Sequence, residues 1–403
     1  MLNLFIKGPK SGPPHFMTIV LMAATAAMTM NIFLPSLTAI SEEFDISYSR
    51  AQLVLSGYLG VTALVQLLIG PLSDRYGRRP VILTSYLFFV TGSVICLVAP
   101  SFEILLLGRL IQASAITSMA LSRAIIRDLY SRSKAASMIG YVTMAMAIGP
   151  MLAPVLGGLL QEYYSWRASF LLLAVLAILM AILCLFDLGE TNKSKSNNLV
   201  TQFRNYGQLI REKTLWLYII AAASSAGVFF SFIGGADYVG RNFLGLTPTQ
   251  IGLYFMIVSF GYVGGNFLSG RYAERIGLEK MMITGAAVTV LGVLVSIALF
   301  SSGYYHPASL FGPMLIVGIG NGLSLPSASA GAVSVRIDLA GSAAGLMGCL
   351  QVAGGATLSF LAAYFLGPDT GPFPMLAIML ASSVICLVAS TMIYRAPRPV
   401  EVE

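Results

Sequence analysis

Charged side chains are the residues best suited to chemistry in this sequence, because only 10% of its residues are charged. A cluster of them lies in GPLSDRYGRR, which holds Gly70, Asp74, Arg75, Gly77, Arg78 and Arg79. Arginines anchor helix ends at a membrane interface, and a carboxylate accepts hydrogen bonds from a neighbouring helix N-terminus. We therefore expect Asp74 to make such a contact in one state of the protein and to lose it in another, as a gate would. Plain anchoring is the alternative.

Arg109 is the second candidate, since the apolar run around it predicts a place about 9 Å deep in a membrane helix. An ionisable group at that depth is costly and is a functional candidate by default. Asn31 lies at a similar depth on another expected helix, so Asn31 and Gln112 are expected to meet the guanidinium. Neither amide can neutralise the positive charge of the guanidinium. We therefore predict a positively charged cavity that would bind an anionic group. The alternative is a structural Arg109 bonded to backbone carbonyls.

Two carboxyl groups are candidates for binding a proton, Asp237 and Asp128. Asp237 lies near the expected outer end of a helix, where Arg241 follows one turn later, so an ion pair is the competing interpretation. Asp128 is expected to pair with Arg127 or Arg132 at the inner surface.

Further polar and aromatic side chains are expected on helices that border a substrate path. They are Tyr58, Thr117, Tyr141, Ser224, Ser231, Tyr262, Asn321 and Ser324. The competing interpretation is structural, because a serine in a membrane helix often bonds only to its own backbone.

Enzymatic chemistry finds little support in the sequence. No Gly-Lys pair provides a P-loop, and neither H-E-x-x-H nor G-x-S-x-G occurs. The two histidines and four cysteines show no metal-ligand spacing. We expect no enzyme activity, no metal and no cofactor, and a process driven by a gradient.

The composition requires a membrane. The chain has 403 residues, is 57% hydrophobic and has a mean hydropathy of +0.81. Repeated apolar stretches of about 20 residues are each long enough to cross a hydrocarbon core as a helix. They predict an all-α membrane protein with twelve spans, near 16–37, 51–70, 81–99, 103–124, 135–160, 167–187, 215–238, 249–269, 281–301, 308–331, 342–366 and 373–394.

The basic residues predict the orientation. All 24 Lys and Arg residues except Arg50, Arg109, Arg167 and Arg241 fall in segments that are cytoplasmic if both termini are cytoplasmic. This accounts for the net charge of +7 without nucleic acid. Lys7 and Lys10 before an apolar run also fit a signal peptide, but eleven further spans favour an uncleaved first helix. We expect both termini to be cytoplasmic.

The sequence repeats itself after a shift of 200 residues. GPLSDRYGRR then aligns with GRYAERIGLE, which places Glu274 and Arg275 opposite Asp74 and Arg75, and Asp45 aligns with Gly245. We expect two six-helix bundles, residues 1–187 and 215–403, joined by a cytoplasmic linker over 188–214. An even number of spans gives the bundles the same orientation, so the substrate path lies between them.

Small residues recur every fourth position on the expected fifth and eighth spans. They are Ala145, Gly149, Ala153 and Gly157, and Gly261, Gly265 and Ser269. Such faces let helices approach closely in lipid. We expect the two faces to touch across the bundles near the outer side, with Pro150 and Pro154 bending the fifth span. Packing within one bundle is the alternative.

These motifs resemble those of the major facilitator superfamily over nearly the whole chain. Residues 70–79 match its loop signature, Arg109-x-x-Gln112 resembles its fourth-helix motif, and Gly149-Pro150-x-x-x-Pro154-x-x-Gly157-Gly158 resembles the fifth-helix motif of exporters. The runs FLPSL, SRAIIRDLY, WRASF and GLTPTQIGLYF resemble the Bcr/CflA group of drug and metabolite exporters. That group usually has Asp where this chain has Asn31.

The resemblance implies proton-coupled efflux of a drug-like compound or small metabolite by a monomer in a bacterial inner membrane, through rocker-switch alternating access. Two alternatives stay open. One is export of an anionic carboxylate-bearing metabolite such as a siderophore, favoured by the unpaired Arg109. The other is a membrane receptor that kept the fold without transport.

Overall fold

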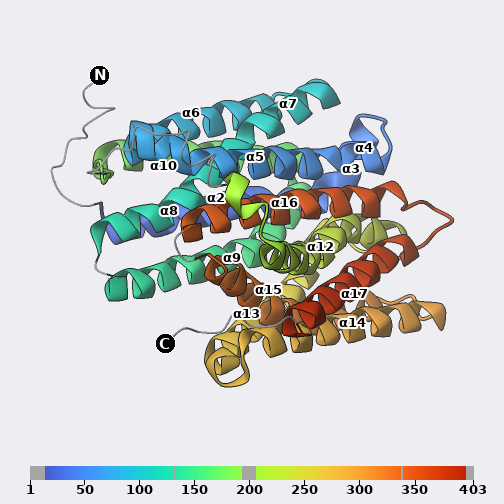
Figure 1. The fold of residues 1–403 in the computed structure, drawn as a ribbon. Helices are drawn as coiled ribbons and strands as arrows, with labels where there is room; N and C mark the ends of the chain where they lie inside the picture. Colours follow the sequence, from blue (N-terminus) through green and yellow to red (C-terminus); the bar gives the residue numbers. More distant parts are fainter. Residues whose placement is uncertain (1–13, 131, 193–205, 337–338, 396–403) are drawn as a thin grey trace.

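The computed structural model describes residues 14–130, 132–192, 206–336 and 339–395, and these residues form helices and connecting turns without any strand. In Figure 1 the helices run roughly side by side, with α6 and α7 at one edge and α14 and α17 at the other. Part of the expected linker, residues 193–205, lies outside the described residues, as do the basic residues Lys7 and Lys10.

The first six spans occupy the N-terminal half. They are α2 (Phe16–Asn31), η1 (Leu34–Ser36) and α3 (Leu37–Glu43); α4 (Tyr48–Ala51) and α5 (Leu53–Tyr76); α6 (Arg78–Leu97); α7 (Phe102–Gln112), η2 (Ala113–Ala115) and α8 (Ile116–Leu129); α9 (Arg132–Tyr163); and α10 (Trp166–Asp187). The C-terminal half holds α12 (Lys213–Asn242), α13 (Pro248–Ile276), α14 (Leu278–Ser301), α15 (Pro307–Ser334), α16 (Ala340–Tyr364) and α17 (Phe373–Arg395).

Eleven helical segments of the described residues are long and apolar enough to cross a membrane. The segment α9, with 32 residues, is also longer than the roughly 20 residues that a crossing needs. Large apolar side chains are exposed along these helices, for example Leu87 and Phe88 on α6 and Leu179 and Phe186 on α10. A lipid environment explains this exposure, and the predicted all-α membrane protein with twelve spans is confirmed.

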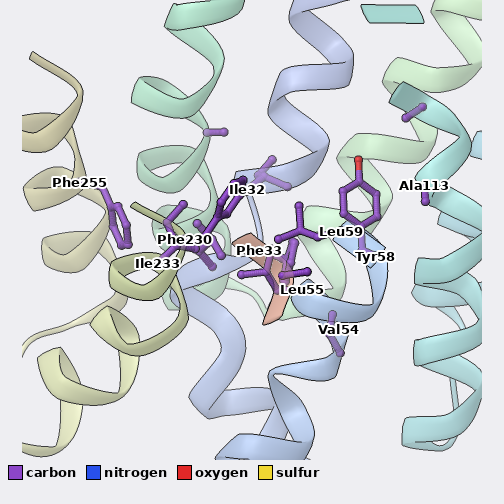
Figure 2. Packing of buried hydrophobic residues seen from close by; sticks show 14 of the residues in the cluster. Ile32, Phe33, Val54, Leu55, Tyr58, Leu59, Ala113, Phe230, Ile233 and Phe255 are labelled. Carbon is purple, nitrogen blue, oxygen red and sulfur yellow. The ribbon is translucent and has the colours of Figure 1, made fainter. Parts of the chain in front are cut away.

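The first span is not the continuous helix expected over 16–37. It ends at Asn31, passes through the short 3-10 turn of η1 and resumes as α3. Pro35 causes the interruption, because proline has no backbone N–H and clashes with the preceding turn. Figure 2 shows Ile32 and Phe33 next to this break, between Leu55 and Tyr58 of α5 and Phe230 of α12.

The backbone supports the alignment of the two halves. Gly77 (φ 103°) and Gly277 (φ 91°) have positive φ at equivalent turns, and each N–H donates to a carbonyl four residues earlier, that of Ser73 or Ala273. Asp45 (φ 48°), the non-glycine residue with positive φ in the described part of the chain, aligns with Gly245 (φ 63°). The halves share their turns as well as their sequence pattern.

Asp45 provides a test of this backbone assignment. Asp45→Val is expected to lower the free energy of unfolding by about 1 kcal/mol, because a β-branched side chain is more strained in the left-handed region than Asp, whose short polar side chain tolerates it. Asp45→Gly, which relieves that strain, should unfold at the wild-type temperature or above it. The measurement is the thermal unfolding midpoint of the purified protein. Equal midpoints for the two variants would contradict the positive φ at this turn.

Candidate functional site

The charged loop between α5 and α6 forms a network at one end of the N-terminal half. Arg78 forms ion pairs with Asp74 (2.6 Å) and with Asp128 at the end of α8 (3.1 Å). The ion-pair partner that the described residues show for Asp128 is therefore Arg78 and not the expected Arg127, whereas the Arg132 side chain lies outside the described residues. Sequence spacing favoured those neighbours, whereas the helix packing brings Arg78 to Asp128.

Glu190, which the sequence analysis missed, caps α6. Its two carboxylate oxygens accept from the backbone N–H groups of Arg78 (2.9 Å) and Arg79 (3.2 Å) at the helix N-terminus. We expected Asp74 to accept from a helix N-terminus, and the structure shows its carboxylate in an ion pair with the Arg78 side chain. A β-carbon on Gly77 would overlap the Glu190 carboxylate, so both the turn and the cap require glycine at position 77.

Arg79 anchors a helix end as expected, but from inside the protein. Its side chain is fully buried and donates to the carbonyls of Cys184 (3.1 Å), Leu185 (2.8 Å) and Leu188 at the end of α10. The last carbonyls of a helix have few partners of their own, although that of Cys184 also accepts from the Leu188 N–H (3.1 Å), and a cation suits the helix dipole there. Arg75 is exposed and lies over the Tyr76 ring, 5.4 Å from its centroid.

The equivalent loop between α13 and α14 in the C-terminal half has the same glycine turn, but in the described part of the chain it lacks the ion pairs that Arg78 forms in the N-terminal half. Glu274 and Arg275 are exposed, and neither forms a side-chain hydrogen bond or ion pair that the described residues show. Gly70 and Gly270 both leave open space where a side chain would begin.

Arg109 lies in an aromatic enclosure. It is fully buried, and its guanidinium carbon lies 4.1 Å from the ring centroid of Phe33, 4.2 Å from that of Tyr58 and 5.9 Å from that of Phe170. Its nitrogens donate to the carbonyls of Val54 (3.2 Å) and Thr29 (3.4 Å). The expectation of a positive cavity is therefore not met in this conformation, and the structural alternative describes the contacts.

The two amides expected beside Arg109 behave differently from each other. Gln112 accepts from the guanidinium (2.5 Å) and donates to the hydroxyl of Ser93 on α6 (2.7 Å). Asn31 is buried and donates to the Ala27 carbonyl of its own helix (3.2 Å). No Asn31–Arg109 bond is present within the described residues, because Asn31 ends α2 just where the span breaks.

The remaining polar candidates divide into buried and accessible side chains. Thr117, Ser224, Ser231, Asn321 and Ser324 are all buried. Asn321 accepts from Ser225 on α12 (3.0 Å), a residue that the sequence analysis missed. Tyr141 is 53% exposed and Tyr262 is half-buried, whereas Tyr58 is buried against Arg109.

Asp237 bridges the two halves at the end of the molecule that the topology predicts to be outside, called the outer end below. It is 1% exposed. Its carboxylate accepts from the backbone N–H (2.8 Å) and hydroxyl (2.6 Å) of Thr38, and from Arg241 (3.2 Å). The expected ion pair with Arg241 is present. Thr38, in the opposite half, could not be found from sequence spacing.

The fifth and eighth spans also meet across the halves, but through other residues than expected. A β-carbon on Gly158 would overlap the Pro248 carbonyl, and one on Gly252 would overlap that of Pro154. Gly149 and Gly157 instead face the first span, and Gly261 and Gly265 face α15. The expected contact between the two small-residue faces is therefore wrong, because each face packs within its own half. α9 runs as one helix through Pro150 and Pro154.

The chain folds into apolar helices, and Thr38 of the first half bonds to Asp237 of the second half at one end of the molecule. This is the architecture of a multi-span membrane protein built from two repeats. A family model described as Major Facilitator Superfamily matches residues 19–357 and 241–403. The chain belongs to this superfamily.

Its relatives and structural neighbours agree with that assignment. The chain is 28% identical to "Bicyclomycin resistance protein homolog" of Haemophilus influenzae, covering 93% of this chain and 94% of that protein. It is 27% identical to "Multidrug resistance protein D" of Escherichia coli, covering 88% and 89%. A bacterial homologue of the human lysosomal transporter Spinster, solved in an inward-facing and occupied conformation, shares the fold with a TM-score of 0.72 at 17% identity, over 94% and 95% of the chains.

Proposed function

We propose that this protein is a proton-coupled efflux transporter of a bacterial inner membrane. It exports a drug-like compound or small metabolite as a monomer with both termini in the cytoplasm. Residues 1–187 and 215–403 act as two bundles joined by the 188–214 linker, and the substrate path between them opens to one side at a time. The names of the relatives support the efflux direction and the substrate class.

One observation carries this proposal: hydrogen bonds between the halves gather at the outer end. Besides Asp237 and Thr38, the Tyr48 hydroxyl donates to the Gly234 carbonyl (3.1 Å), and Gln52 donates to the Ser359 hydroxyl (2.8 Å). The Thr249 N–H donates to Glu162 (3.2 Å). Contacts of this kind hold one end shut and can break together when two rigid bundles rock.

The alternatives lose their main support. An anionic substrate was favoured by a cationic Arg109 open to the cavity, but the rings around Arg109 leave no approach for a carboxylate in this conformation. A receptor without transport was favoured by Asn31 in place of the usual Asp. The closed outer end retains a buried ionisable carboxyl group, that of Asp237, so loss of the carboxyl at position 31 does not remove every proton-binding candidate. Asp128, held by Arg78, is the second candidate.

Proteoliposomes test the proposal. Bicyclomycin and a chemically unrelated dye are each expected to be transported in exchange for protons that move down an imposed pH gradient. Without an imposed gradient, adding either compound should drive proton movement in the opposite direction to its own. Asp237→Asn should reduce the substrate-induced proton movement by roughly tenfold or more, because an amide cannot carry a proton between the two sides. Glu103→Gln is the matched control, since it removes an exposed carboxylate at the same end, and it should keep both activities. Transport that survives a protonophore would contradict coupling, and no transport of any compound would contradict efflux.

A further inference from the structure

We infer that Asp237 is a positioning residue that closes the outer end by capping, from the opposite half, the break in the first span. This inference rests on the proposed alternating access, in which the outer end must both close and open. It assigns a conformational role to the Asp237–Arg241 pair, separate from any role in carrying protons.

The break creates backbone groups without partners in their own helix. The first N–H groups of any helix have no carbonyl one turn earlier to accept from them. Thr38 is the second residue of α3, and Ser36, the residue at the cap position, makes no side-chain cap. The Thr38 N–H donates instead to Asp237, and the Thr38 hydroxyl donates to the same carboxylate oxygen. The cap of α3 is thus supplied by α12.

Arg241 satisfies the other side of the break. One of its nitrogens donates to the Pro35 carbonyl (2.7 Å), and another donates to the second carboxylate oxygen of Asp237 (3.2 Å). A single ion pair of the C-terminal half therefore bonds to one donor, the Thr38 N–H, and to one acceptor, the Pro35 carbonyl, at the break in the N-terminal half. Tyr48 packs against the residue that follows Asp237, with its ring centroid 4.9 Å from that of Tyr238.

These bonds exist only while α12 lies against η1 and α3. The Asp237 side chain is 1% exposed and that of Arg241 is 18% exposed, so separating the helices would hydrate both charges and the freed backbone groups together. Removing the carboxylate destabilises the closed state alone. In that state the Thr38 N–H and Arg241 would stay buried without their acceptor, whereas in the open state water would hydrate them. The charge at position 237 therefore biases the equilibrium between closed and open outer ends.

The repeat shows that this arrangement is one-sided. The shift of 200 residues places Leu37 opposite Asp237 and Ser41 opposite Arg241. It also places Gly235, inside the continuous α12, opposite Pro35. The N-terminal half thus contains the break and the C-terminal half supplies its cap. Contacts between the halves can close the outer end only if the two partners lie on different halves.

The test measures conformation at constant pH without substrate. Spin labels at Glu42→Cys and Asp369→Cys, exposed positions on opposite halves of the outer end, report the separation of the halves by pulsed electron resonance. The background lacks the four native cysteines. Asp237→Ala is expected to raise the ratio of open to closed outer ends by roughly tenfold, as the loss of one charge-assisted bond predicts. Thr38→Val, which keeps every charge, should shift the ratio in the same direction by less.

Two further variants make the result decisive. Asp237→Glu, which keeps the charge, is expected to restore part of the closed population. Glu103→Gln breaks the 2.7 Å ion pair with Arg50, which joins two segments of the same half at the outer end, and should leave the distances unchanged. An unchanged distribution in both Asp237→Ala and Thr38→Val, or an equal shift in Glu103→Gln, would overturn the inference. Because the readout needs neither substrate nor proton gradient, a failed transport assay would leave this result standing.

Discussion

Replacing Arg109 by alanine is expected to lower the free energy of unfolding by about 3 kcal/mol, as truncation of a large buried side chain does. The change would empty the space between the rings of Phe33 and Tyr58 and would remove the donors to the Thr29 and Val54 carbonyls. These contacts join the first, second and fourth spans, so transport should be lost with stability. The measurement is the thermal unfolding midpoint, with an expected fall of about 5 °C.

Two further substitutions at position 109 separate packing from charge. Arg109→Met keeps most of the volume and needs no partner, so it should unfold near the wild-type temperature, since apolar replacement of a buried charge is often neutral. Arg109→Lys should unfold lower, because an ammonium cannot lie flat between two rings and donate to separated carbonyls. If Arg109→Ala unfolded at the wild-type temperature, the aromatic enclosure would not contribute to stability. If folded Arg109→Met did not transport, the charge itself would be needed.

Replacing Gly157 by alanine should have the second large effect. An added β-carbon would overlap the Ile32 carbonyl oxygen, which is backbone and cannot turn away as a side chain can. α9 would have to separate from the first span beside its break, at a cost of about 3 kcal/mol for an overpacked contact. We expect little folded protein in the membrane, measured as monodisperse protein after detergent extraction.

Gly60→Ala is the matched control for Gly157→Ala. Gly60 also lies inside a helix, α5, but outside its own helix backbone and chain neighbours no described atom lies within 4 Å of the place where its β-carbon would be. This variant should therefore fold at least as well as the wild type, because alanine favours a helix over glycine by about 0.5–1 kcal/mol. Equal yields of the two alanine variants would show that the contact between α9 and the first span is not tight.

Much of the fold could be predicted because a bilayer leaves few choices. A backbone in hydrocarbon must satisfy its own hydrogen bonds, so an apolar run of sufficient length can only be a helix. The alignment of Asp45 with Gly245 also carried structural information, since both residues have positive φ. The interruption at Pro35 was the main departure, because a proline inside an apolar run can either bend a helix or end it.

The partners of the charged residues could not be predicted in the same way. Helical spacing fixes contacts three or four residues apart, such as Asp237 with Arg241. The contacts of Glu190 with the start of α6, of Arg78 with Asp128 and of Asp237 with Thr38 depend on how helices are rotated and packed. The rotation of the fourth span also determines the surroundings of Arg109, because the same side chain faces either a cavity or a set of aromatic rings according to the angle of its helix.

The loops around Gly77 and Gly277, at the end of the molecule opposite the outer end, differ in their contacts, and this difference affects how the two halves can deform. In the first loop Arg78 connects α5 to α8, and Arg79 and Glu190 connect α6 to the end of α10, so a force applied there is shared by four helices. Around Gly277 the described contacts of Glu274 and Arg275 supply no such bracing. At this end the N-terminal half therefore resists deformation more than the C-terminal half does.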